Sequence, residues 1–178
     1  MKKINVLVTT VGGLTSPDIL SALKNTGKYD VTLFGIDEFK FAVGKEFVDH
    51  FEVLSSSGCN ELEFVHAIKE LVLTHKIDVI IPCGNEDNLT LAKYRSLIPC
   101  IIMVGEYKDL AVAYDKAKVY SELKNSMPQH APKYHVVRNY AGFLKAVKDL
   151  GYPNKRVVVK PRFGIGGRGV YILGGQFD

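Results

Sequence analysis

Short apolar runs alternate with amphipathic stretches over the first 105 residues of the chain. The runs are rich in β-branched residues and too short for helices, so each predicts a buried strand; they lie at residues 4–9, 31–36, 51–54, 79–81 and 101–104. They are continuously apolar rather than alternating, as expected of parallel strands that are covered on both faces. The pattern therefore predicts an α/β fold with a doubly wound, Rossmann-like parallel sheet.

The stretches between these runs carry helix signals. Residues 15–18, Thr-Ser-Pro-Asp, open the first helix with a hydroxyl cap, a proline in the first turn and an acid at the positive end of the helix dipole. This helix is expected to stop near Gly27. The second begins around Glu61 and places apolar residues on one face at helical spacing. The third is capped by Asp87 or Asn88.

The pattern changes after residue 105, and we expect a domain boundary between residues 106 and 112. The second part predicts a helix at 115–123, a proline-punctuated connection at 126–132, a strand at 134–137 and a helix at 139–150. Two β-branched runs then flank a glycine-rich loop. We assign residues 1–110 to the first domain and 111–178 to an α+β unit whose sheet is incomplete and needs more chain to bury its faces.

The glycine-rich loop is the most specific chemical feature. Four glycines fall within residues 164–169, where backbone N–H groups can approach phosphate oxygens, and Lys160 and Arg168 add positive charge. The spacing matches the dinucleotide fingerprint G-x-G-x-x-G, but β-forming residues follow Gly169 where that motif requires a helix. No Gly-Lys-Ser/Thr of a P-loop is present. The loop predicts a lid over a triphosphate; the alternative is an ordinary hairpin, at an unusual cost in chain entropy.

The segment V-V-V-K-P-R-F-G-I-G-G-R-G-V at 157–170 resembles the phosphate lid of the ATP-grasp superfamily. It is most similar to the branch of the carbamoyl-phosphate synthase large subunit and biotin carboxylase. Asp115-Lys116 resembles an Asp-Lys or Asp-Arg pair that opens a helix at this distance before the lid in that branch. The first domain resembles the family's pre-ATP-grasp domain, so the resemblance covers the whole chain.

The resemblance implies roles for individual residues. Lys160 would reach the α- and β-phosphates of ATP, and Lys116 would contact phosphates from the helix start. The backbone groups that would cover the β- and γ-phosphates are those of Gly166, Gly167 and Gly169, and the helpers would be Arg162 and Arg168. A triphosphate carries about four negative charges, so it needs such converging cations and N–H donors. The alternative for Lys160 is a solvent-facing lysine at a strand end.

The family uses ATP and Mg²⁺ to activate a carboxylate or bicarbonate as an acyl phosphate, which an amine or similar nucleophile then attacks. The resemblance implies that this chain is the N-terminal portion of such a ligase. The family's adenine hinge, acidic Mg²⁺ ligands and catalytic arginine lie downstream of the lid, so no catalytic residue or metal ligand is assigned here. We expect this chain alone to be inactive, to bind ATP weakly at most, and to be mobile across residues 163–169. Such enzymes are often homodimers.

The carboxyl ends of two strands form a second candidate site. Gly12 and Gly13 follow the first strand and Glu86 follows the fourth, and ligands bind where such ends meet in a doubly wound sheet. The resemblance implies that this domain helps to bind the acceptor substrate, with Glu86 near it. The alternatives are a tight turn for the glycines and helix capping by residues 85–88. Asp37 would hold a ribose in a dinucleotide-binding domain, but the glycine fingerprint is missing at Gly12.

Composition narrows the function classes. The 178 residues are 47% hydrophobic and 24% charged, and their net charge of +4 is spread without a basic run, which does not favour nucleic-acid binding. No apolar stretch is long enough to span a membrane. The three cysteines match no disulfide or zinc pattern and favour buried thiols in a reducing compartment, the cytoplasm; Cys83 has no partner histidine for a nucleophilic role. Two alternative functions stay open: a non-catalytic nucleotide- or metabolite-binding module, and a dinucleotide-dependent oxidoreductase or epimerase.

Overall fold

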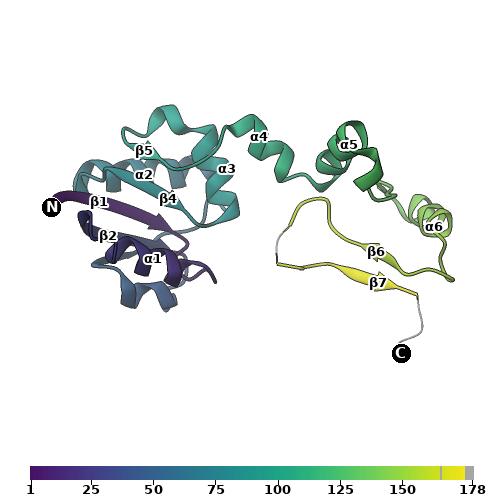
Figure 1. Ribbon diagram of the computed structural model, residues 1–178, viewed down its shortest axis with the longest axis horizontal. Coiled ribbons are helices and arrows are strands. Elements are labelled where there is room, and N and C mark those ends of the chain that lie inside the picture. The colour runs from purple at the N-terminus through teal and green to yellow at the C-terminus, as the bar shows by residue number, and fades with distance from the viewer. Residues whose placement is uncertain (165, 175–178) are drawn as a thin grey trace. The chain divides into compact units, whose positions relative to one another are not determined.

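The computed structural model describes residues 1–164 and 166–174. The chain divides into two compact units, Met1–Leu110 and Ala111–Asp178. The first contains a five-stranded parallel sheet of order β3-β2-β1-β4-β5 (Figure 1). Its strands are β1 (Lys2–Thr9), β2 (Tyr29–Asp37), β3 (His50–Val53), β4 (Val79–Pro82) and β5 (Ile101–Ile102). All five predicted strands are confirmed.

Strand β5 is shorter than predicted, and the backbone that follows it is bound by the side chain of Arg95. Its guanidinium donates to the carbonyl oxygens of Val104 at 2.5 Å and Gly105 at 3.0 Å, and also to the carboxylate of Glu106 at 3.1 Å. The side chain therefore fixes the backbone just beyond β5. The chain leaves the sheet at this point.

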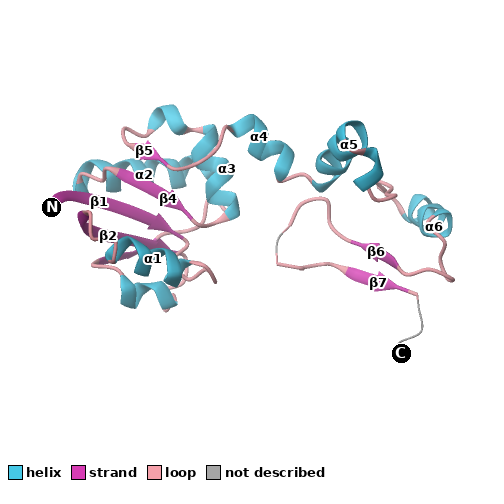
Figure 2. Ribbon diagram, viewed as in Figure 1, coloured by secondary structure: helices cyan, strands magenta, loops and turns pink. Residues whose placement is uncertain are grey.

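Helices cover both faces of this sheet, as the doubly wound prediction requires (Figure 2). They are α1 (Ser16–Lys24), α2 (Glu61–His75) and α3 (Asn85–Lys93), with short 3₁₀ helices at Val43–Phe47 and Arg95–Leu97. On one face, Leu7 and Ile80 share a buried cluster with Ile68 of α2. On the other, Val8 shares a cluster with Leu20 of α1. Alternate residues of the central strands β1, β2 and β4 thus pack on opposite faces, which explains their continuous apolar runs.

Two predicted helix caps are wrong. Helix α3 begins at Asn85 with Gly84 in the capping position, so Asp87 lies inside the first turn, and its side chain is used elsewhere. Thr15 precedes α1 but makes no side-chain capping bond, because its own backbone is already helical. Proline at the start of α1 is confirmed and supplies a preset φ there.

The second unit contains two helices and a hairpin. Its elements are α5 (Lys116–Ser126), a 3₁₀ turn at Pro128–His130, α6 (Tyr140–Asp149), β6 (Val157–Val159) and β7 (Tyr171–Leu173). The two strands are antiparallel, with Val158 opposite Ile172, so the predicted strand–turn–strand is confirmed. The predicted strand at 134–137 is wrong: these residues pair with no described strand and line a pocket instead. Helix α4 (Tyr107–Ala113), which links the units along the chain, was not predicted.

Candidate functional site

The glycine-rich loop joins β6 to β7. Gly164, Gly166, Gly167 and Gly169 have positive φ angles of 132°, 62°, 72° and 69°, which side-chain-bearing residues rarely adopt. A Cβ atom would meet nothing within 4 Å at Gly166 or Gly167, whereas at Gly169 it would lie 2.9 Å from Cγ of Pro161. The tip of the loop therefore presents bare backbone to open space. Ile165, which lies within the segment predicted to be mobile, is outside the described residues.

The first turn of α5 lies against the stem of this loop. Asp115 is the N-cap of α5, and its Oδ1 accepts from the N–H groups of Ala117 at 3.1 Å and Lys118 at 3.4 Å. The same carboxylate accepts two bonds from Arg162, Nε to Oδ1 at 2.7 Å and Nη2 to Oδ2 at 2.6 Å. Asp115 is only 2% exposed. The hydrogen bonds from Arg162 lower its pKa to about 2, so it is ionised at neutral pH.

Lys116 and Lys160 are held by neutral partners. Nζ of Lys116 donates to the carbonyl oxygen of Gly164 at 2.7 Å. Nζ of Lys160 contacts the hydroxyl of Tyr120 and lies 4.8 Å from the centroid of its ring. Within residues 1–164 and 166–174, neither ammonium group has a carboxylate oxygen within 4.0 Å. Among these residues, then, only Arg162 of the three cations is paired with a carboxylate.

Both lysines line one pocket of about 470 Å³ in the second unit. Its other polar lining residues include Arg162, Tyr120, Lys133, His135 and Arg156, and apolar side chains of β6, α6 and residues 132–137 line the rest. Tyr120 packs 5.2 Å from the ring of Tyr134. The structure thus brings together three predicted residues, Lys116, Lys160 and Arg162. The loop glycines and Arg168, whose side chain is exposed, are not among the described lining residues.

Tyr120 is the functional-site residue that sequence reasoning missed. It lies four residues after Lys116, a spacing that places two side chains on the same face of a helix. That spacing indicates that Tyr120 lies beside Lys116, and it can be read from the sequence. Tyr134, 14 residues farther on, follows a proline-rich connection, and no local pattern links it to Tyr120.

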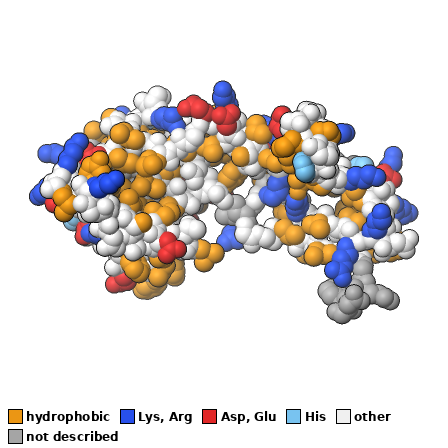
Figure 3. Space-filling view, in the orientation of Figure 1, with side chains coloured by type: hydrophobic (Ala, Val, Ile, Leu, Met, Phe, Trp, Pro, Cys, Tyr) orange, Lys and Arg blue, Asp and Glu red, His pale blue; other side chains and the backbone are white. Residues whose placement is uncertain are grey.

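Charge is unevenly divided between the two units. Residues 111–178 contain 12 Lys or Arg and 4 Asp or Glu, whereas residues 1–110 contain 11 and 15. Figure 3 shows the resulting predominance of basic over acidic side chains on one face of the second unit. The unit that holds the pocket is therefore the one whose charge favours an anionic ligand.

The second candidate site lies at the carboxyl ends of β1 and β4, where the strand order reverses. The N–H of Gly12 donates to Oδ2 of Asp37 at 2.8 Å, and Oδ1 of Asp37 accepts from the N–H of Phe39 at 2.9 Å. Gly13 donates its N–H to the carbonyl of Thr10 at 2.9 Å, closing a tight turn. Both oxygens of Asp37 are thus engaged by backbone, which does not support a ribose-binding role. Glu86 is exposed, and a substrate role for it stays a prediction.

A buried carboxylate joins three segments of the chain at this edge of the sheet. Asp87 accepts hydrogen bonds from the hydroxyls of Thr9 at 2.6 Å, Thr10 at 2.8 Å and Ser57 at 3.0 Å, and it is 4% exposed. These contacts link the ends of β1 and of the loop before α2 to the first turn of α3. A cavity of about 70 Å³, lined in part by Thr10, Asp37 and Asp87, lies beside them.

Other candidate chemistry is weaker. No three His, Cys, Asp or Glu side chains of the described ranges group closely enough to hold a metal ion. Burial raises the pKa of the Cys83 thiol, so it stays protonated at neutral pH and does not favour a nucleophilic role. None of the helices in the described part of the chain has the length and apolar character needed to cross a bilayer.

The chain matches no protein-family model. Over 106 residues, 57% of its length, it is 26% identical to the carbamoyl phosphate synthase large chain of Methanobrevibacter smithii, of which it covers 10%. It therefore corresponds to a small part of that protein.

Three solved structures share the fold across nearly the whole chain. N5-carboxyaminoimidazole synthetase from Staphylococcus aureus, complexed with ADP, has a TM-score of 0.70 and 18% identity, and matches 99% of this chain and 43% of its own. The biotin carboxylase domain of Hydrogenobacter thermophilus 2-oxoglutarate carboxylase was solved as a dimer with MgADP, ADP and bicarbonate. Its TM-score is 0.66 and its sequence identity 17%, and the match covers 96% of this chain and 37% of that domain's chain. L-amino acid ligase from Bacillus licheniformis has a TM-score of 0.64 and 17% sequence identity, and the match covers 99% of this chain and 40% of the ligase.

These comparisons confirm the resemblance that the sequence suggested. The chain has the fold of the N-terminal part of ATP-grasp enzymes of the carbamoyl-phosphate synthase and biotin carboxylase branch. It spans less than half the length of each of these relatives. At identities of 17 to 18%, the structural likeness establishes the fold alone.

Proposed function

We propose that this chain, with the fold of the N-terminal part of ATP-grasp enzymes, forms the N-terminal portion of an ATP-dependent ligase. The ligase activates a carboxylate or bicarbonate as an acyl phosphate. The observation that carries the proposal is the pocket in which Lys116 and Lys160 lie near the stem of an open glycine loop, each with a neutral partner among the described residues. A pocket of this kind suits a polyanion, because two ammonium charges are available to it.

Because the present partners of Lys116 and Lys160 are neutral, replacing them by phosphate oxygens is favourable. A phosphate oxygen replacing the Gly164 carbonyl would give Lys116 a charge-assisted hydrogen bond, roughly twice as strong as one between neutral groups. The same exchange applies to Lys160, whose present partner is a phenol. We assign phosphate contacts to these two side chains and to the backbone of Gly166, Gly167 and Gly169. Arg168 adds charge at the loop tip, whereas Arg162 is committed to Asp115.

The chemistry divides one difficult acylation into two steps. The terminal phosphoryl group passes from ATP to a carboxylate oxygen and ADP leaves; a nucleophile such as an amine then attacks the carbonyl carbon and displaces phosphate. Phosphoryl transfer of this kind uses Mg²⁺, whose ligands we expect outside this chain. Relatives of the same fold were solved with ADP, MgADP and bicarbonate, which supports this choice of ligands. We also propose a homodimer, since the biotin carboxylase domain of 2-oxoglutarate carboxylase is a dimer.

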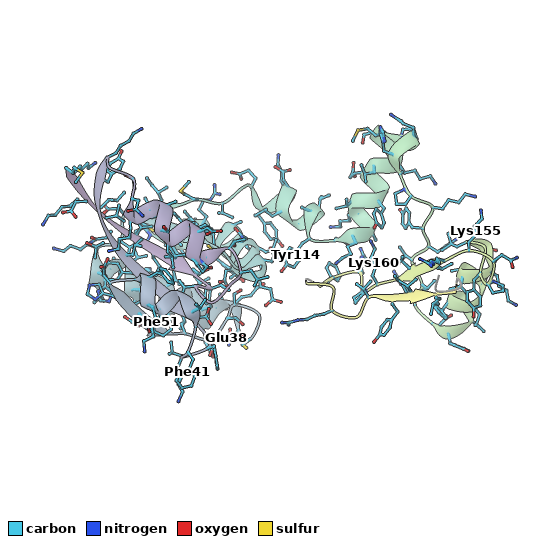
Figure 4. All side chains as sticks on the ribbon, turned by 60° about the horizontal axis from the view of Figure 1, so that its bottom comes forward. Glu38, Phe41, Phe51, Tyr114, Lys155 and Lys160 are labelled. Atoms are coloured by element: carbon cyan, nitrogen blue, oxygen red, sulfur yellow. The ribbon has the colours of Figure 1, made fainter. Side chains whose placement is uncertain are left out.

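Replacing Lys160 by alanine in the full-length protein is expected to lower ADP release by about 100-fold, because a preorganised charge facing the phosphates is lost. ADP release is measured with ATP, Mg²⁺, bicarbonate or a panel of carboxylates, and an amine. Lys155→Ala is the matched control: Lys155 lies at the opposite end of β6, outside the pocket (Figure 4). It should leave the rate within about twofold of the wild type.

Two results would contradict the proposal. An unchanged rate in Lys160→Ala would remove the role assigned to that lysine. Full-length protein that binds ATP but never releases ADP with any acceptor would instead favour the non-catalytic binding module. Fluorescence titration with NADH tests the remaining alternative, since a dinucleotide-dependent enzyme would bind it at the ends of β1 and β4.

A further inference from the structure

The stem of the glycine loop is tied to the first turn of α5 by four hydrogen bonds. Two form the pair between Asp115 and Arg162. A third joins the backbone N–H of Lys116 to the carbonyl of Arg162 at 3.2 Å, and the fourth joins Nζ of Lys116 to the carbonyl of Gly164. The tip, by contrast, has open space around Gly166 and Gly167. The loop is therefore anchored at its entry and unobstructed where it would cover a ligand.

Asp115 has a second effect, because it occupies the helix N-terminus itself. Its Oδ1 accepts from the N–H groups of Ala117 and Lys118, which would otherwise be free to bind a phosphate. A carboxylate at this place would also repel phosphates held by the adjacent Lys116. The guanidinium of Arg162 removes that repulsion, since it matches the carboxylate charge with two hydrogen bonds in parallel.

We infer that Asp115 and Arg162 are positioning residues for the nucleotide. Their ion pair fastens the loop stem to α5, so that Lys116 and the loop backbone meet the phosphates in one fixed arrangement and without a competing negative charge. The role rests on the contact between the two side chains: Nε and Nη2 of Arg162 are both bonded to the carboxylate of Asp115. The inference rests on the proposed function of the pocket and adds to it the part that sets the geometry.

The ionisation of Asp115 is consistent with a pair that persists under assay conditions. Its pKa is lowered to about 2 by the hydrogen bonds from Arg162, and an aspartate in an unfolded chain has a pKa of about 3.9. A lowered pKa means that the pair stabilises the folded unit fully above about pH 4 and loses this effect as the pH falls toward 2. At neutral pH the carboxylate is charged.

The decisive variant is Asp115→Asn in the full-length protein. Asparagine is as good an N-cap as aspartate, so α5 keeps its cap while the ion pair is lost. Simple electrostatics predicts tighter ATP binding, because Arg162 would be left unmatched next to an anion site. Positioning predicts the opposite: a KM and Kd for ATP raised about tenfold, with faster hydrogen exchange confined to the peptide that covers residues 161–170.

Two further variants complete the test. Arg162→Lys keeps the positive charge but loses the planar guanidinium group that makes two parallel hydrogen bonds to Asp115. It should raise the Kd for ATP about threefold to tenfold. Asn139→Asp makes the reverse exchange at the cap of α6, where Asn139 accepts from the N–H of Gly142 at 2.8 Å, and should leave the Kd unchanged. If Asp115→Asn lowers the melting temperature markedly, Arg162→Lys decides by the same measurements.

The outcomes separate this inference from the proposed function. Wild-type protein that does not bind ATP overturns both. Wild-type protein that binds ATP, together with Asp115→Asn binding equally well or more tightly with an intact fold, overturns only the positioning role. Weaker binding with faster exchange in residues 161–170 supports it.

Discussion

Replacing Asp87 by alanine is expected to lower the free energy of unfolding of the first unit by about 3 kcal/mol. The carboxylate accepts three hydroxyl groups, and two of them, on Thr9 and Ser57, are almost fully buried. Removing the shared acceptor takes away the only side-chain partner that these two buried hydroxyls have among the described residues. Each unpaired buried group costs about 1–3 kcal/mol, so the effect is large for one substitution.

Native-state hydrogen exchange of amides in β1 and β4 measures this change locally, which matters because a chain of two units need not unfold in one step. Asp30→Ala is the control, since Asp30 is exposed and no side-chain bond to it is found among the described residues. It should change stability by less than about 0.5 kcal/mol. If Asp87→Ala changed stability as little as this control does, the hydrogen bonds to Asp87 would contribute nothing measurable to the free energy of unfolding.

Replacing Gly44 by alanine is expected to destabilise the same unit by about 3 kcal/mol. A Cβ at this position would lie 2.1 Å from the carbonyl oxygen of Val11 and 2.6 Å from its Cβ. Val11 is fully buried and its N–H is bonded to the carbonyl of Ile36 at 3.2 Å, so it has little freedom to move away. The clash involves backbone atoms and is not relieved by a rotamer change.

Urea unfolding followed by circular dichroism, together with hydrogen exchange in β1, measures this effect. Gly105→Ala is the matched control in the same unit, because its added Cβ would meet only Leu110 at 3.8 Å, an ordinary contact. We expect that variant to lie within about 0.5 kcal/mol of the wild type. Equal stability of the two variants would mean that the close approach of Gly44 to Val11 is not a constraint.

The sheet of the first unit could be predicted because the signal for a buried parallel strand lies in residues that are adjacent in the sequence. Parallel strands that are covered on both faces bury or half-bury side chains on each of them, so they leave an unbroken apolar run such as the one that became β4. Residues 134–137 have the same local character and form no strand. A strand also needs a hydrogen-bonding partner, and composition does not report whether one lies alongside.

The candidate site was predicted only in part for a related reason. Lys116 and Lys160 belong to recognisable local motifs, but the pairing of Asp115 with Arg162 spans 47 residues. Asp87 was expected to cap a helix from its local context, whereas its bond to Thr9 spans 78 residues. The identity of a capping residue can be inferred from its neighbours. The partner of a buried hydrogen bond depends on which distant segments the fold brings together, so it cannot be inferred from adjacent residues.

The guanidinium of Arg95 determines how the first unit should be isolated for study. A truncated protein ending at Ile102 would delete both carbonyl acceptors and Glu106, and would leave this cation without the partners that it has in the folded chain. Truncation after Leu110 retains all three. We expect the longer fragment to be recovered from expression as folded protein and the shorter one to be degraded, a difference of eight residues that the strand boundary alone would not suggest.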